Sequence, residues 1–94
     1  MKPYYKTLVV LCRLARKDSR PQAFSITPRE LILHLEQDWE ETIRELSHLS
    51  IEGLVTCDRK DSYIIRITEK GWKKAATFDQ ATAVDLHRTA LSFN

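Results

Sequence analysis

Long apolar runs are missing from this sequence. The longest, Leu8 to Cys12, is followed at once by Arg13, whereas a helix that spans a bilayer needs about 18 to 20 apolar residues. The N-terminus also has neither the apolar core nor the cleavage site of a signal peptide. We therefore expect a cytoplasmic protein that has no contact with a membrane.

Cysteine is scarce as well. Cys12 and Cys57 are the two cysteines, and they are 45 positions apart (57 − 12) with no C-x-x-C pair. The three histidines, at positions 34, 48 and 87, do not share a metal-ligand spacing with them or with each other. We predict no disulfide, no metal site and no cofactor, and we expect both cysteines to be small buried apolar side chains.

A catalytic constellation is also missing. Ser47 and His48 are neighbours in the sequence, but adjacent residues on a helix point about 100° apart. No other nucleophile with a base, and no pair of carboxylates in a recognisable pocket motif, is present. The prediction is that the protein is not an enzyme.

Charge of both signs is present but segregated along the chain. The net charge is +2, in a chain of 94 residues with 43% hydrophobic and 30% charged residues. Residues 1–20 carry 6 − 1 = +5, residues 30–45 carry 1 − 6 = −5, and residues 66–74 carry 4 − 1 = +3. This composition is typical of one globular domain over residues 1–94, with basic flanks around an acidic middle.

Helix signals occupy the first half. Apolar residues recur at helical spacing over Tyr5 to Lys17, and Phe24 to Ile26 is a candidate short strand. Thr27-Pro28-Arg29-Glu30 is a capping box with proline at the first helical position, so a second helix begins at Pro28 with Leu31, Ile32 and Leu35 on one face. Asp38 caps a third helix that runs to about Glu52. Two helices joined by so short a turn form a helix-turn-helix.

Strand signals follow the third helix. Gly53 occupies the position of a left-handed helix end, and the runs Leu54–Asp58 and Ser62–Ile67 predict a β-hairpin. Thr68 caps a further helix, in which Trp72, like Trp39 earlier, is expected to pack in the core or in an interface. A break near Asp79 divides a core over residues 1–78 from a C-terminal helix over residues 79–94.

The spacing of apolar residues and glycines across these elements is similar to a known sequence pattern. The pattern Ile43-x-x-Leu46-x-x-Leu49-x-x-x-Gly53-Leu54-Val55, with Ile67-Thr68-Glu69-Lys70-Gly71 after the hairpin, resembles the winged helix-turn-helix of the MarR and PadR families of bacterial transcriptional regulators. The resemblance covers about Pro28 to Ala76. It implies a mainly α fold with a small β-hairpin (α+β), a homodimer built on a helix outside the core, and sequence-specific binding of double-stranded DNA. Because the sequence is short, we expect no separate effector domain of the kind that the larger families have.

The resemblance also implies which residues meet DNA. The helix from Trp39 would enter the major groove, with Thr42, Arg44 and His48 facing bases. Arg29, Arg59 and Lys60 lie where phosphate contacts are natural. An apolar stripe in the C-terminal helix predicts the dimer interface, formed by Val84, Leu86, Leu91 and Phe93.

One alternative stays open. Glu40, Glu41 and Glu45 are expected on the face of the third helix that would meet DNA, where carboxylates oppose phosphate binding. Acids in the first turn also stabilise a helix through its dipole, by about 0.3 to 1 kcal/mol each. The alternative is a winged-helix module that binds a basic protein partner through this acidic face, without DNA.

Overall fold

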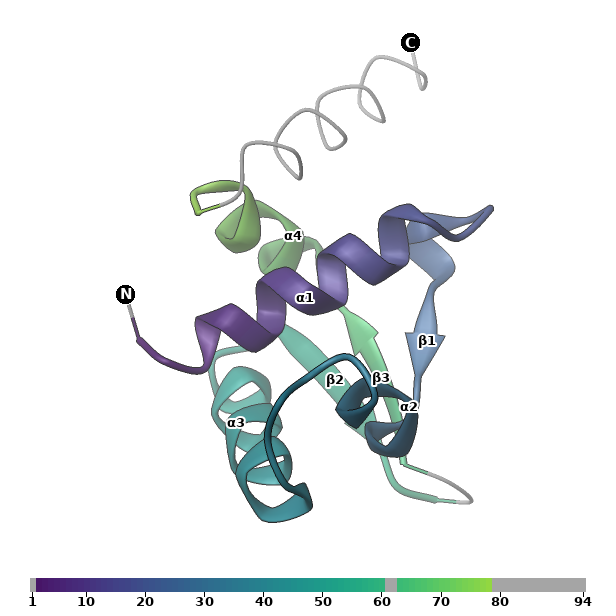
Figure 1. The fold of residues 1–94 in the computed structure, drawn as a ribbon. Coiled ribbons are helices and arrows are strands. Elements are labelled where there is room, and N and C mark those ends of the chain that lie inside the picture. Colours follow the sequence, from purple (N-terminus) through teal and green to yellow (C-terminus); the bar gives the residue numbers. More distant parts are fainter. Residues whose placement is uncertain (1, 61–62, 79–94) are drawn as a thin grey trace, which may run out of the picture.

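The computed structural model describes residues 2–60 and 63–78, and it confirms the predicted mixture of helices with a small antiparallel sheet (Figure 1). The predicted C-terminal helix and the four predicted dimer residues lie outside the described residues. In chain order the elements are α1 (Tyr5–Arg16), η1 (Pro21–Ala23), β1 (Ser25–Ile26), α2 (Pro28–Ile32), α3 (Trp39–Ile51), β2 (Val55–Asp58), β3 (Ile64–Ile67) and α4 (Glu69–Ala76).

The start of α2 follows the capping chemistry. The Thr27 hydroxyl accepts from the Glu30 N–H at 3.3 Å, and the Glu30 carboxylate accepts from the Thr27 N–H at 3.4 Å. The predicted extension of α2 to Leu35 is wrong, because the helix ends at Ile32. Three successive bonds of the i to i−3 type tighten the chain there, and Leu33 is left 81% exposed while Leu35 turns in to pack against the core.

Gly53 turns the chain from α3 into the sheet. Its φ of +75° is the positive value that the sequence predicts. The Gly53 N–H donates to the Ser50 carbonyl at 3.0 Å, and the Leu54 N–H donates to the Leu49 carbonyl at 2.9 Å. These two bonds form a Schellman motif, which satisfies carbonyls at the end of α3 and sets the direction in which β2 leaves it.

The sheet has the order β1-β3-β2 within the described residues. β2 pairs antiparallel with β3 through Val55–Ile67 and Cys57–Ile65, which confirms the predicted hairpin. β1 pairs antiparallel with the other edge of β3, with Ile26 opposite Ile65. The central strand β3 therefore has a partner on each side, and β1 ties the loop before α2 to the hairpin.

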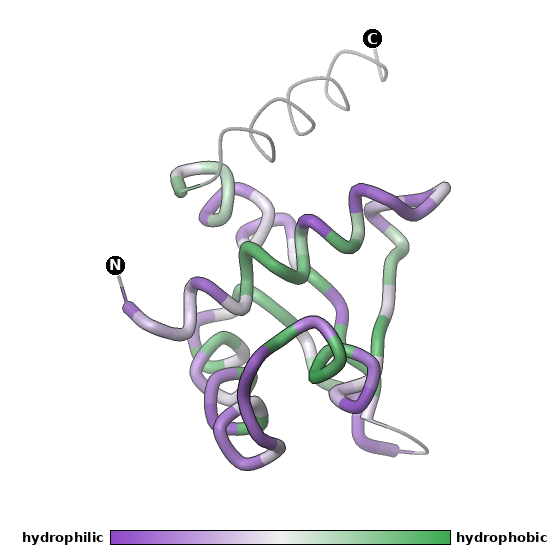
Figure 2. Tube along the Cα trace, in the orientation of Figure 1, coloured by the Kyte–Doolittle hydropathy of each residue, from purple (hydrophilic) through white to green (hydrophobic). Residues whose placement is uncertain are grey.

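The core lies where α1 crosses the other elements, between α4 on one side and α2 and α3 on the other (Figure 1). Apolar segments of α1 and of the strands turn toward this centre, whereas most of α3 is hydrophilic (Figure 2). Trp72 and Cys12 are buried in the core as predicted. Cys57 is only half-buried, which departs from the prediction of a buried position, and Trp39 is 51% exposed, so of its two predicted positions it is not in the core. Among the described residues, the fully buried apolar side chains include those of Leu8, Leu11, Leu31, Leu46, Leu49, Leu54 and Ile65.

Two further features close the core. The Thr68 hydroxyl accepts from the Gly71 N–H at 2.9 Å, which caps α4, and donates to the Gly53 carbonyl at 2.7 Å. Gly71 lies so close to β2 that a Cβ there would overlap the Leu54 carbonyl oxygen and lie 3.1 Å from Ile67 Cγ2. The end of α3, the hairpin and α4 therefore meet at one junction. None of the helices described here has the length and apolarity of a membrane span.

We predict that Gly71→Ala lowers the free energy of unfolding by about 1 to 3 kcal/mol, because the added methyl group must displace backbone. Thermal unfolding followed by circular dichroism measures this as a fall in Tm of roughly 4 to 8 °C per kcal/mol. Lys70→Ala, at the exposed neighbouring position, is the control and should change stability by no more than about 0.5 kcal/mol. Equal stability of the two variants would contradict the close packing of α4 on β2.

Candidate nucleic-acid interface

The outer face of α3 is defined by helical geometry. Leu46 and Leu49 point into the core, so the residues half a turn away, Arg44, Ser47 and Ile51, form the opposite face. Arg44 is exposed, and the structure gives its side chain no partner among the described residues. A guanidinium with unused donors at this position is available to a carboxylate, a phosphate or a base edge.

Thr42 does not lie on this face, and its predicted role toward bases is corrected here. Its side chain is 0% exposed. The Thr42 hydroxyl donates to the Asp38 carbonyl at 2.9 Å and accepts from Gln37 Nε2 at 3.2 Å. Thr42 therefore secures the first turn of α3 to the preceding loop. The helix start at Asp38 places position 42 on the same face as the buried Leu46 and Leu49.

His48 lies at one edge of the outer face. Its ring stacks on Tyr4, with centroids 4.9 Å apart and an interplanar angle of 10°. Tyr4 is the residue before α1, so the N-terminal segment covers one face of the imidazole. His48 is still exposed to solvent, but it stands beside α1 and away from the centre of the outer face.

The acidic residues of α3 divide into two groups. The Glu45 carboxylate accepts from the Thr7 hydroxyl and from Gln37 Nε2, each at 2.6 Å. Glu45 thus turns toward α1, and its predicted position on the outer face is wrong. Glu40 and Glu41 remain exposed in the first turn of α3. The outer face is therefore less acidic than the sequence alone indicates.

Glu52, the C-cap residue directly after α3, is held by the N-terminal segment. Its carboxylate accepts from the hydroxyls of Tyr4 and Tyr5, the latter at 2.6 Å, and Lys2 Nζ lies 3.9 Å away. The Tyr4 and Tyr5 hydrogen bonds keep the pKa of Glu52 below its ordinary value. The hydrogen bond to Glu52, together with burial, raises the pKa of Tyr5 to about 12. The cluster links the N-terminal segment to α3. It also reaches α4, because Lys74 Nζ lies 5.1 Å from the centre of the Tyr5 ring.

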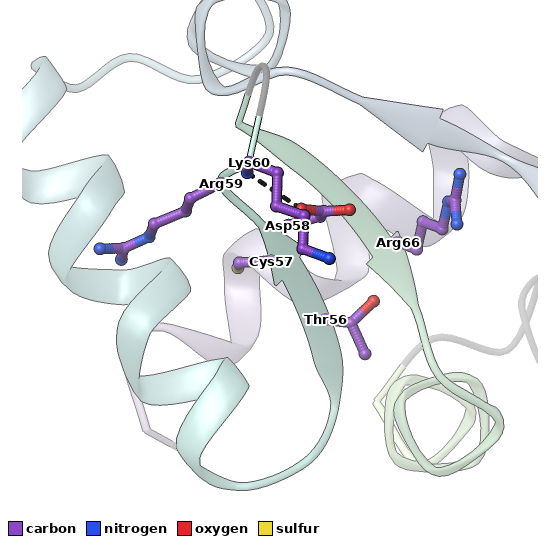
Figure 3. Close-up of a pocket in the computed structure, with 6 residues that line it drawn as sticks. All are labelled: Thr56, Cys57, Asp58, Arg59, Lys60 and Arg66. Carbon is purple, nitrogen blue, oxygen red and sulfur yellow. Dashed lines mark hydrogen bonds between the residues drawn. The ribbon is translucent and has the colours of Figure 1, made fainter.

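The hairpin sends its two predicted phosphate-binding residues in different directions. Arg59 points toward α3, whereas Lys60 lies on the side of Asp58 and Arg66 (Figure 3). The Arg59 guanidinium lies 4.8 Å from the centre of the Tyr63 ring and donates to the Tyr63 hydroxyl at 3.2 Å. The Lys60 N–H donates to the Asp58 carboxylate at 3.1 Å. The two side chains are adjacent in sequence but point in different directions, and Lys60 lines only the hollow on the Arg66 side.

Two hollows flank the hairpin accordingly. One, of about 320 Å³, separates α3 from the hairpin and is lined by Ser47, Ser50, Ile51, Cys57, Arg59 and Tyr63. The other, of about 730 Å³, is drawn in Figure 3 and is lined by Thr56, Cys57, Asp58, Arg59, Lys60 and Arg66. The first hollow contains no acidic residue among its lining side chains, so it is the more suitable of the two for an anion.

Arg29 is the remaining predicted contact. It is exposed at the second position of α2, and the structure describes no bond of its side chain to the residues around it. Within residues 2–60 and 63–78, no three His, Cys, Asp or Glu side chains are grouped so as to hold a metal ion. Sequence reasoning missed the Tyr4–Tyr5–Glu52 cluster and the Arg59–Tyr63 pair. For the Arg59–Tyr63 pair, the sequence offers one signal, which is the four-residue spacing across a short hairpin. For the Tyr4–Tyr5–Glu52 cluster it offers none.

Comparisons with known proteins extend the description of the fold. No family model matches the sequence, and no curated protein matches it either. Among solved structures, the Multiple Antibiotic Resistance Repressor, MarR, is similar in fold, with a TM-score of 0.63 and 24% sequence identity. The match covers 95% of this chain and 61% of that protein. The chain therefore has a MarR-like winged-helix fold and spans about three fifths of the length of that neighbour.

The Glu52 cluster predicts a pH-dependent contribution to stability. Because the pKa of Glu52 is lowered in the folded state, its contribution is complete above the ordinary value of 4.5 and is lost as the pH falls through the lowered pKa. The pKa of Tyr5 is raised in the folded state, so the contribution of its hydrogen bond to stability is complete below the ordinary value of 10.0. That contribution is lost as the pH rises through about 12.

We therefore expect Glu52→Gln to be less stable than the wild type near neutral pH, and the difference to shrink as the pH falls below 4.5 toward the lowered pKa of Glu52. Urea unfolding at pH values from about 3 to 9 measures it. Glu36→Gln, an exposed acid outside the cluster, is the matched control. A difference between wild type and Glu52→Gln that stays constant over this range would contradict the prediction.

Proposed function

We propose that the protein binds double-stranded DNA in a sequence-specific manner and acts as a transcriptional regulator, which places it in the cytoplasm with the DNA. The observation that carries the proposal is that Arg44, at the centre of α3, is exposed and has no partner among residues 2–60 and 63–78, while the hairpin directs Arg59 toward the same helix. A helix-turn-helix with this arrangement presents its second helix to the major groove. The neighbour in fold is named a repressor, which agrees with this role.

The proposed contacts differ from the predicted set in one residue. Arg44 faces bases, with guanine as the preferred partner because its O6 and N7 accept the two N–H groups of a guanidinium. His48 stands beside it, at the edge nearest α1. Arg29, Arg59 and Lys60 contact phosphates, and Lys60 does so from the far side of the hairpin. Thr42 is excluded because it is buried.

The electrostatics of α3 favour DNA over a basic protein partner. Glu45 and Glu52 are occupied by hydroxyl and amide donors from α1 and its surroundings, so they are not presented to an external partner. Glu40 and Glu41 are in the first turn, where they stabilise α3 through its dipole. The acidic face that the protein-binding alternative requires is thereby reduced to one turn of the helix.

A homodimer belongs to the same proposal. Regulators that use a helix-turn-helix commonly bind two half-sites about one helical turn of DNA apart, which requires two copies of the reading helix. The predicted interface residues, Val84, Leu86, Leu91 and Phe93, follow α4 in the sequence and lie outside the described residues.

The main test is binding to duplex DNA. Fragments selected from a random duplex pool should bind the wild type, and the affinity should fall steeply between about 50 and 200 mM salt because phosphate neutralisation releases counterions. Arg44→Ala should weaken binding to the best selected site by about 5- to 150-fold and relax the preference at one base pair. Lys17→Ala removes the same charge at the far end of α1 and is the control. No binding at about 50 mM salt, or an affinity independent of salt, would refute DNA binding.

The dimer is tested separately by sedimentation equilibrium of the full chain. We expect a mass of about twice the 11.0 kDa of one chain, and we expect Leu91→Asp with Phe93→Asp to return the protein to one copy. A wild-type mass that stays near 11.0 kDa at high protein concentration would contradict a homodimer.

A further inference from the structure

The cleft between α3 and the hairpin has an unusual lining for the surface of a polar helix. Ile51 is 83% exposed at the last position of α3, the highest exposure among the large apolar side chains of the described residues. It stands beside Ser50 on α3 and faces Arg59 and Tyr63 of the hairpin. An apolar side chain, hydroxyl groups and one guanidinium therefore share a cleft of about 320 Å³.

Arg59 is held in this cleft before any ligand arrives. The Tyr63 ring supports its guanidinium by a cation–π contact at 4.8 Å, and the Tyr63 hydroxyl accepts one of its N–H groups at 3.2 Å. A guanidinium has five N–H donors, so most of them remain available to an acceptor. Holding the side chain in one conformation reduces the entropy that is lost when it binds.

The hydroxyl groups of the cleft are not equivalent. The Ser47 hydroxyl donates to the Ile43 carbonyl of its own helix at 2.9 Å and is committed there. The Tyr63 hydroxyl accepts from Arg59 and interacts with the neighbouring Cys57 side chain, so it is committed within the cleft. Ser50 is exposed, and the structure gives its hydroxyl no partner among the described residues. The cleft thus offers donors from Arg59 and Ser50 beside the apolar surface of Ile51.

We propose that this cleft holds one strand of the DNA backbone, with a phosphate on Arg59 and Ser50 and the adjoining deoxyribose against Ile51. The inference rests on the proposed function: if α3 occupies the major groove and the hairpin lies over the neighbouring minor groove, the strand that separates the two grooves must pass between them. The charge of the lining matches that strand, because Arg59 is its one charged residue.

The proposal gives Tyr63 and Ile51 distinct roles. Tyr63 is a positioning residue that acts through Arg59, whereas Ile51 contacts the sugar directly. Since a deoxyribose is the same in every nucleotide, Ile51 contributes to affinity and leaves sequence preference unchanged. The opposite role for Ile51 is contact with the C5-methyl group of thymine, which would make it a base-reading residue.

The experiment uses the full chain and a duplex selected for binding, in which phosphates are replaced one at a time by neutral methylphosphonate. Neutralising the phosphate in the cleft should weaken wild-type binding roughly tenfold. The same replacement should have a much smaller effect on Arg59→Ala, because the partner charge is already absent and only the Ser50 contact remains. Lys60→Ala, on the other side of the hairpin, is the control and should respond to this phosphate as the wild type does.

Salt titrations and DNA substitutions separate the other roles. Arg59→Ala should lower the salt slope by about one. Tyr63→Leu should weaken binding without changing the slope, and Tyr63→Phe, which keeps the ring under Arg59, should restore part of the affinity. Ile51→Ala should weaken binding equally to the selected duplex and to the same duplex with uracil in place of thymine. Circular dichroism confirms that each variant is folded.

Two results would overturn the inference while leaving DNA binding intact. One is that no phosphate replacement distinguishes Arg59→Ala from Lys60→Ala. The other is that the penalty of Ile51→Ala disappears when thymine is replaced by uracil, which would assign Ile51 to a base. Absence of wild-type binding to any selected duplex would instead refute the proposed function, and the inference with it.

Discussion

The hydroxyl of Thr68 joins three parts of the molecule on which the candidate interface depends. It donates to the Gly53 carbonyl at the end of α3 and accepts from the Gly71 N–H at the start of α4. Gly71 allows α4 to pack against Leu54, the residue before β2, because a Cβ at position 71 would overlap the Leu54 carbonyl oxygen. The hairpin is consequently held at both ends, and its angle to α3 follows from this junction. The cleft between α3 and the hairpin exists because that angle is set within the core and away from the site itself.

A second set of contacts decides the charge of the surface that α3 presents. Thr7, Tyr4 and Tyr5 direct their hydroxyls at Glu45 and Glu52, so two carboxylates face α1. A carboxylate that accepts such bonds is stabilised in its charged form and is withdrawn from the outer face. What remains outward is Arg44 between an acidic first turn and an apolar last residue. The N-terminal segment thereby makes the outer face of α3 less acidic, by turning these two carboxylates toward α1.

Local chemistry accounts for the elements that were predicted from sequence. The capping box at Thr27, the Asp38 cap, the left-handed Gly53 and the Thr68 cap each depend on residues within a few positions, and each is present. The hairpin follows from alternating β-branched residues around a polar turn. The errors arise where distant residues intervene. Leu35 leaves its helix to pack on the core, and Glu45 turns to the Thr7 hydroxyl of α1. Thr42 is a different case, because its burial follows from a helical face that it shares with Leu46 and Leu49 and that the spacing already contains.

The residues along the chain were thus sufficient to specify the order of helices and strands and the turns between them, because caps and periodic apolar positions act over a few residues. They also identified Arg29, Arg44, Arg59 and Lys60 as candidates. They were insufficient to tell that Arg59 and Lys60 point in different directions from the hairpin, or that Glu45 and Glu52 face α1. They also did not show that the exposed Ile51 side chain shares a cleft with the Arg59 guanidinium, which Tyr63 holds in place. Those facts depend on which elements pack together, and contacts such as Tyr5 with Glu52 join positions that no local pattern relates.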